Sequence, residues 1–88
     1  MKAFEKLMEE GKGNRVAICK ELFCKQLKEL RAEKELSQKE VAKRLGVAVS
    51  TYANWEQGRT EPSIYDIFSL LFVFNVEATE LFDLTYYR

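Results

Sequence analysis

Cys19 and Cys24 carry the most reactive side chains of this sequence, five positions apart in a segment with a helical pattern. Residues five apart point to different faces of a helix, so we do not expect these thiols to bond to each other. Zinc sites use sets of Cys and His ligands, and the chain has two cysteines and no histidine. We therefore interpret both cysteines as small core or boundary residues.

Catalysis would need residue sets that this sequence lacks. It has no histidine, no glycine-rich phosphate loop and no nucleophile motif, so nothing meets the requirements of an active site. The sequence predicts that the protein is not an enzyme. It also predicts no metal, no other cofactor and no small-molecule substrate.

Hydrogen-bonding side chains within helical segments offer another kind of chemistry. Asn54 lies in the middle of a helical pattern over residues 49–57, where asparagine is a poor helix former without a capping role. This placement favours a binding role. Lys39 and Lys43 are four apart and share one helix face, either as contacts for anions or as an ordinary solvated surface.

The charge of the chain is zero overall but unevenly distributed. Residues 1–62 carry 13 Lys/Arg and 10 Asp/Glu (13 − 10 = +3), whereas residues 63–88 carry 1 and 4 (1 − 4 = −3). Zero net charge argues against nucleic-acid binding, because such proteins are usually basic. The uneven distribution of charge along the chain allows a weakly basic face opposite an acidic end.

These side chains must be positioned by helices, because no strand pattern of period two occurs. The 88 residues are enough for one domain. We assign residues 1–13 to an N-terminal arm, with Phe4, Leu7 and Met8 on one side of a short helix, and residues 14–88 to the domain. No apolar run is long enough for a membrane span or a signal peptide, which predicts no membrane partner and a cytoplasmic location.

The first helix of the domain is predicted to begin after the N-cap Asn14 and to end near Lys34. Its apolar stripe consists of Val16, Cys19, Phe23, Leu27 and Leu30. A short helix should follow, opened by the capping box Ser37-Gln38-Lys39-Glu40 and ended by Gly46.

A second short helix is predicted over residues 49–57, only two or three residues after the first. Tyr52 and Trp55 should face inward, and Gly58 should end it. Two short helices joined by a tight turn that contains glycine are typical of a helix-turn-helix.

Two more helices complete the expected all-α fold. Ser63 should cap a helix that runs to about Phe74, where Asn75 provides a left-handed stop. The last short helix is predicted over residues 78–84 and should bury Leu81 and Phe82.

Four spaced blocks of the sequence resemble the Cro/C1-type (XRE-like, lambda-repressor-like) helix-turn-helix family. The blocks are Leu36-Ser37-Gln38-Lys39-Glu40-Val41-Ala42, Leu45-Gly46-Val47 with Ser50-Thr51-Tyr52, Trp55-Glu56-Gln57-Gly58-Arg59 with Pro62-Ser63, and the tail from Asn75 to Leu84. The resemblance covers about residues 20–84. It implies a five-helix lambda-repressor-like DNA-binding domain whose helix over 49–57 lies in the major groove of double-stranded DNA.

The resemblance also implies roles for individual residues. It places Val49, Ser50, Thr51 and Asn54 against base edges, and Gln38, Lys39, Lys43 and Arg59 against phosphates. Alternatives stay open, since Val49 also closes a turn and since Ser50 and Thr51 also suit the first turn of any helix. Arg31 and Glu56 stand where the family pairs an arginine and a glutamate, which predicts a structural salt bridge.

Two residues depart from the family pattern. Glu35 replaces the usual glycine, so we expect either a strained left-handed residue or a different helix end. Ala48 replaces the usual Ser or Thr N-cap, a loss of about 1 kcal/mol.

Aromatic residues make the predicted helix over 64–74 apolar nearly all round, which implies burial on more than one side. Tyr65, Phe68 and Phe72, with Tyr86 beyond the last helix, would form a surface for the N-terminal arm or for a second subunit, and we favour a homodimer. The leading hypothesis is a sequence-specific transcriptional regulator, a repressor, on a palindromic site. The alternative is a protein-interaction module that binds another regulator or a toxin.

Overall fold

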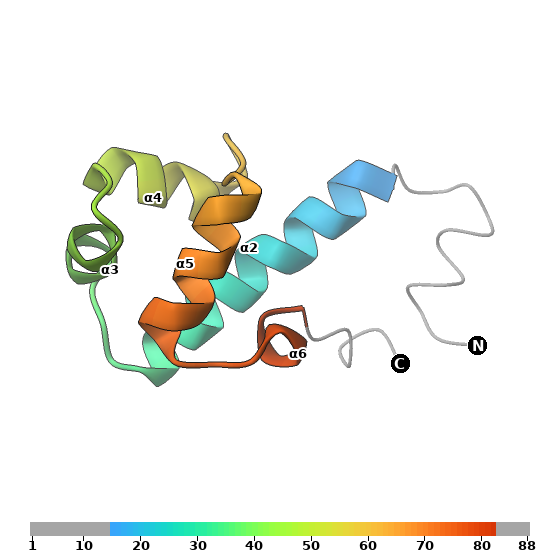
Figure 1. The fold of residues 1–88 in the computed structure, drawn as a ribbon. Helices are drawn as coiled ribbons and strands as arrows, with labels where there is room; N and C mark the ends of the chain where they lie inside the picture. Colours follow the sequence, from blue (N-terminus) through green and yellow to red (C-terminus); the bar gives the residue numbers. More distant parts are fainter. Residues whose placement is uncertain (1–14, 83–88) are drawn as a thin grey trace.

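The computed structural model describes residues 15–82, and within them the backbone forms five α-helices and no strand, as predicted. The helices are α2 (Arg15–Glu33), α3 (Gln38–Leu45), α4 (Val49–Gln57), α5 (Ile64–Phe74) and α6 (Ala78–Leu81). Figure 1 shows α3 and α4 at one end of the long α2, with α5 across it. The expected arm over 1–13, the N-cap Asn14 and Tyr86 lie outside the described residues. No described helix has the length and hydropathy needed to cross a bilayer.

One hydrophobic core joins all five helices. Its buried members are Leu27, Leu30, Val41, Ala42, Tyr52, Trp55, Leu70, Phe74 and Leu81. α4 packs against both α2 and α3, while α5 packs on α3 and α6 on α2. The longest described helix, α2, therefore supports the helix-turn-helix through α4, and α5 supports it through α3.

The helix starts follow from short-range capping, as the sequence predicted. The backbone N–H of Glu40 donates to Ser37 Oγ at 3.0 Å, and the N–H of Ser37 donates to the Glu40 carboxylate at 3.2 Å. Ser63 and Asp66 make the same reciprocal pair at 3.1 and 2.9 Å. Each box satisfies two backbone donors that the first helical turn would otherwise leave without a partner.

Three predicted stop residues take the left-handed conformation. Gly46 has φ 77°, Gly58 has φ 74° and Asn75 has φ 54°. Glu35 is also left-handed, with φ 57°. Of the two expectations for this position, the strained left-handed residue is therefore confirmed, and not a different helix end. The N–H of Leu36 donates to the Arg31 carbonyl at 3.1 Å and closes this helix end.

Replacing Glu35 with glycine is expected to stabilise the domain by about 0.5–1 kcal/mol, because glycine adopts a positive φ without the clash of a Cβ. Glu35 is exposed, so few contacts are lost. Urea unfolding measures the change. The matched control is Gly46→Ala, whose Cβ would meet no atom within 4 Å and which should cost about 1 kcal/mol from backbone strain alone. A destabilised Glu35→Gly variant would contradict the prediction.

Two expectations about burial were wrong in part. Val16 is 57% exposed and Cys19 is exposed, so the predicted stripe of α2 is buried at Leu27 and Leu30 but not at its N-terminal end. Phe82 was expected to be buried and is 49% exposed, because α6 ends at Leu81 and Phe82 lies outside the helix. Ile18 and Leu22 in the same part of α2 are buried instead, so the buried side of this helix changes along its length and leaves the predicted stripe there.

Candidate nucleic-acid interface

α4 has two sides with different roles. Tyr52, Trp55 and Glu56 are buried against the core. Ser50 is exposed and Asn54 half-buried on the opposite side, and Val49, at the first position of the helix, is 43% exposed, while Thr51 is half-buried. The helix is therefore anchored by one face and presents a short row of small and hydrogen-bonding side chains on the other.

The predicted pair of Arg31 and Glu56 is present and bidentate. Arg31 Nε donates to Glu56 Oε2 at 2.6 Å, and a terminal N–H donates to Oε1 at 3.1 Å. A third donation, to the Leu36 carbonyl at 3.1 Å, ties the same guanidinium to the segment that leads into α3. The ion pair thus links α2, the entry to α3 and the buried face of α4.

Gln38 is the third member of this cluster. Its amide nitrogen donates to Glu56 Oε1 at 3.1 Å, so one carboxylate receives hydrogen bonds from both α2 and α3. Burial raises the pKa of Glu56, but the donations from Arg31 and Gln38 outweigh it and hold that pKa below its usual value. Since an amide nitrogen has two hydrogens, Gln38 retains a second donor for a ligand at the surface.

The hydroxyl of Tyr52 is buried beside this cluster. It makes no hydrogen bond in good geometry with any described residue, although it lies close enough to Glu56 to influence the carboxylate. Burial raises the pKa of Tyr52 well above its ordinary value, so the phenol stays neutral. The ring itself packs edge-on against Trp55, with centroids 6.0 Å apart.

The three predicted phosphate-contacting cations are all exposed. Lys39 and Lys43 lie on the outer side of α3, and Arg59 follows the glycine that ends α4. The backbone N–H of Arg59 donates to the Asn54 carbonyl at 2.9 Å, which fixes the start of the loop relative to α4. Exposed cations therefore lie on α3, which precedes α4, and in the loop that follows α4.

Sequence reasoning missed two features of this surface. Gln57 lies in the last turn of α4 and is exposed, three residues after Asn54 and thus on a neighbouring part of the same helix. The spacing of three positions between Asn54 and Gln57 could have predicted this from the sequence. The hydrogen bond from Gln38 to Glu56 had no such signal, because it joins residues 18 positions apart through the packing of α3 on α4.

The sequence profile of the helix-turn-helix family HTH_3 matches residues 27–81, more than half of the chain, and the chain belongs to this family. The match runs from the middle of α2 to the end of α6. The resemblance inferred from the sequence blocks is confirmed.

Known relatives are named as regulators of transcription. The chain is 33% identical over 60 residues to the cryptic phage CTXphi transcriptional repressor RstR of Vibrio cholerae, covering 68% of this chain and 54% of that protein. It is 36% identical over 56 residues to an HTH-type transcriptional regulator of Archaeoglobus fulgidus, covering 64% and 79%. The chain thus spans about half the length of the first of these relatives.

Solved structures share the fold. The restriction-modification controller protein C.AhdI from Aeromonas hydrophila superposes with a TM-score of 0.68 at 33% identity, covering 72% of this chain and 96% of that one. An HTH_3 family transcriptional regulator from Vibrio cholerae gives 0.68 at 25% identity, covering 74% and 36%. Together these matches place the chain in a family of transcriptional regulators and not of enzymes.

Proposed function

We propose that the protein is an intracellular, sequence-specific regulator of transcription, a repressor, that binds double-stranded DNA as a homodimer with α4 in the major groove. The observation that carries this proposal is the two-sided α4. Its inner face is fixed by Trp55, Tyr52 and the Glu56 cluster, while Ser50 and Asn54 face outward. A rigid helix with an accessible polar side is what reading base edges in the major groove requires.

Base recognition is assigned to the open side of α4. Ser50 can donate or accept a hydrogen bond, Asn54 can pair with adenine through two hydrogen bonds, and Val49 and Thr51 can contact a thymine methyl group. Phosphate contacts are assigned to Gln38, Lys39, Lys43 and Arg59. In this assignment Gln38 acts from a fixed position, because Glu56 holds one of its amide hydrogens.

The names of the relatives support repression as the activity. RstR is a phage transcriptional repressor, and C.AhdI is a controller protein of a restriction-modification system. Both names describe regulatory proteins, and this chain is 33% identical to each over the matched length.

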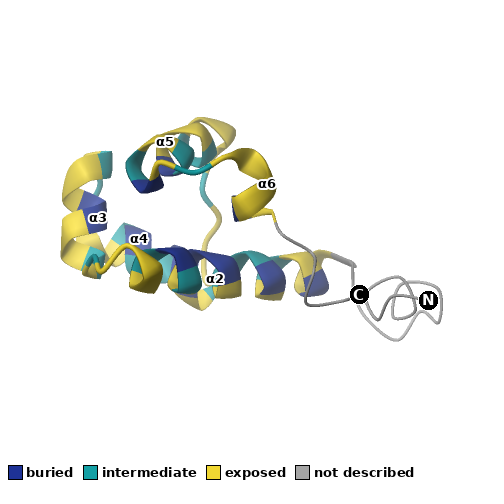
Figure 2. Cartoon of the chain, turned by 90° about the horizontal axis from the view of Figure 1, so that it is seen from below, coloured by how far each residue is buried: buried dark blue, intermediate teal, exposed yellow. Residues whose placement is uncertain are grey.

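Dimerisation is assigned to the aromatic side of α5, which the described chain leaves open. Phe72 is 88% exposed, Tyr65 79% and Phe68 65%, and Figure 2 shows exposed residues along the outer side of this helix. Exposed aromatic residues at positions 65, 68 and 72 form a continuous stripe, because helical residues three and four apart are neighbours. A twofold dimer would place two α4 helices on successive major-groove turns, about 34 Å apart.

The same stripe favours a second candidate function. A protein-interaction module of this fold would use Phe68 and Phe72 to bind another regulator or a toxin, and it would need no DNA. The zero net charge of the chain supports this alternative. The accessible side of α4 and the flanking Lys39, Lys43 and Arg59 oppose it.

Selection of bound sequences from random duplex DNA tests the leading proposal. We expect a palindromic site, with a binding constant whose logarithm falls linearly with the logarithm of the salt concentration. Asn54→Ala should lose discrimination at one base pair in each half-site, by about 1–3 kcal/mol, and leave the salt dependence unchanged. Arg59→Ala should weaken binding to all sequences. It should also lower the slope of log binding constant against log salt concentration by about 1 in magnitude.

Thr79→Ala is the matched control, since Thr79 is exposed on α6 at the other end of the domain. It should change neither sequence preference nor salt dependence. A protein that binds no duplex at low salt, yet binds a protein partner tightly, would replace the proposal with the alternative.

A further inference from the structure

One side of the N-terminal half of α2 is exposed, although Ile18 and Leu22 in the same half are buried. Val16 is 57% exposed and Cys19 is exposed, although both continue the stripe of the buried Leu27 and Leu30. Figure 1 shows this end of α2 extending past the other helices. The family match begins at residue 27, so this part of the helix lies outside the matched segment.

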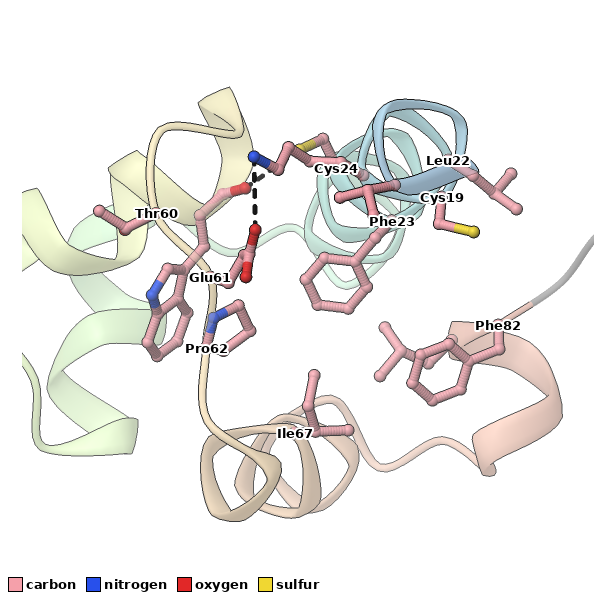
Figure 3. Close-up of a pocket in the computed structure, with 13 residues that line it drawn as sticks. Cys19, Leu22, Phe23, Cys24, Thr60, Glu61, Pro62, Ile67 and Phe82 are labelled. Carbon is pink, nitrogen blue, oxygen red and sulfur yellow. Dashed lines mark hydrogen bonds and ion pairs between the residues drawn. The ribbon is translucent and has the colours of Figure 1, made fainter. Parts of the chain in front are cut away.

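These side chains form one wall of an apolar groove of about 580 Å³ between α2, α5, α6 and the loop after α4. Figure 3 shows Phe23 of α2, Ile67 of α5 and Phe82, directly after α6, pointing into the groove. The rings of Phe23 and Phe82 stack with centroids 6.2 Å apart. Among the described residues that line the groove, only Lys20 and Glu61 are charged, and they pair with each other at 3.3 Å. Replacing water in such a groove with apolar side chains is favourable.

We propose that residues 2–10 of the same chain occupy this groove as a short amphipathic helix. In a helix, Phe4, Leu7 and Met8 share one face, since they are separated by three and four positions. Residues 11–14 then form a four-residue link, a length that joins antiparallel neighbouring helices. Glycine at two of these four positions makes the reversal of direction easy.

The covalent connection to α2 favours residues 2–10 over other occupants of the groove. The segment is joined through residues 11–14 to Arg15, the first residue of α2, and the next residue, Val16, lines the groove. Its local concentration at the groove is therefore in the millimolar range, which a second copy or a free ligand does not reach. A helix of nine residues is not stable alone, so its three apolar side chains gain both burial and helical order by docking.

The thiol of Cys19 reports on the occupant, because it lines the groove and is otherwise exposed. The full chain is alkylated with iodoacetamide under native conditions and then digested with trypsin, which cleaves after Lys20 and separates Cys19 from Cys24. We expect Cys19 to react at least tenfold more slowly in the native chain than in the Phe4→Asp/Leu7→Asp variant. The readout involves no DNA, so it is independent of the proposed function.

Lys6→Asp/Glu9→Asp is the matched control. In a helix over residues 2–10 it also introduces two aspartates, but on the face opposite Phe4 and Leu7. It should leave Cys19 protected. Equal rates in the native chain and the Phe4→Asp/Leu7→Asp variant would overturn the proposal. So would protection that is lost on dilution, which indicates a second copy, or protection lost only in Leu84→Asp/Tyr86→Asp, which indicates the C-terminal segment.

Discussion

Replacing Arg31 with methionine is expected to lower the free energy of unfolding by about 3 kcal/mol or more. The variant removes two charge-assisted hydrogen bonds from Glu56, whose side chain is only 2% exposed, and leaves that carboxylate with only neutral neighbours, Gln38 and the Tyr52 hydroxyl. Taking one partner from a buried ion pair typically costs about 3–5 kcal/mol, because the remaining charge stays desolvated. Urea unfolding followed by circular dichroism measures the loss.

The pH dependence of this loss identifies its cause. In the native chain the pKa of Glu56 is lowered, so its contribution to stability is present above the unfolded-state value near 4.5 and is lost as the pH falls through the folded-state pKa. Without Arg31, burial should raise that pKa above the unfolded value, which reverses the sign. The difference in stability between the native chain and Arg31→Met should therefore shrink between pH 7 and pH 4.

Glu56→Gln is the matched control for the Arg31→Met variant. It leaves Arg31 with a neutral partner, and the guanidinium is 24% exposed, so water solvates part of the released charge. We expect a loss of about 1–2 kcal/mol, smaller than that of Arg31→Met. A cost below 1 kcal/mol for Arg31→Met, or a cost that does not depend on pH, would show that the buried charge is not the source of stability.

Replacing Phe72 with glutamate is expected to lower the affinity for a palindromic site by about 100-fold or more. Phe72 is 88% exposed, so the variant should fold with a stability close to that of the native chain. A charge in the aromatic stripe would separate the proposed dimer, and each domain would then bind one half-site without the gain from a linked second site. Sedimentation equilibrium should show a monomer where the native chain is a dimer.

Thr79→Glu introduces the same charge at an exposed position of α6 and serves as the control. It should remain dimeric and bind the palindrome normally, and both variants should bind an isolated half-site equally weakly. A Phe72→Glu protein that stays dimeric would exclude α5 as the subunit interface. A monomer that keeps full affinity for the palindrome would exclude the linkage between dimerisation and DNA binding.

The helix boundaries were predictable because they depend on neighbours in the sequence. Ser37 with Glu40, and Ser63 with Asp66, satisfy donors within three residues of themselves. The left-handed stop at Gly46 likewise needs only its own backbone. Interactions between residues this close in the sequence can be recognised from the sequence alone. The predicted order and approximate limits of four of the five helices therefore agree with the structure.

The features that sequence reasoning missed depend on how helices are placed in space. Cys24 was expected to be a core or boundary residue, but its thiol donation to the Trp55 carbonyl, at 3.2 Å, depends on the contact of α2 with α4. The hydrogen bond from Gln38 to Glu56 likewise depends on α3 lying against α4. The exposure of Val16, close to the buried Ile18 and Leu22, depends on which side of α2 is covered in the folded chain. None of these has a periodic or local signature.

The division of α4 into two faces also separates two kinds of evolutionary change. Ser50, Val49 and Asn54 take no part in the core cluster, so most replacements there should alter folding stability by no more than about 0.5 kcal/mol. The buried side chains of α4, by contrast, fix the helix on the core, so we expect few replacements to be tolerated at Tyr52, Trp55 and Glu56. A scaffold built in this way can acquire new sequence preferences through single substitutions, without compensating changes in its interior.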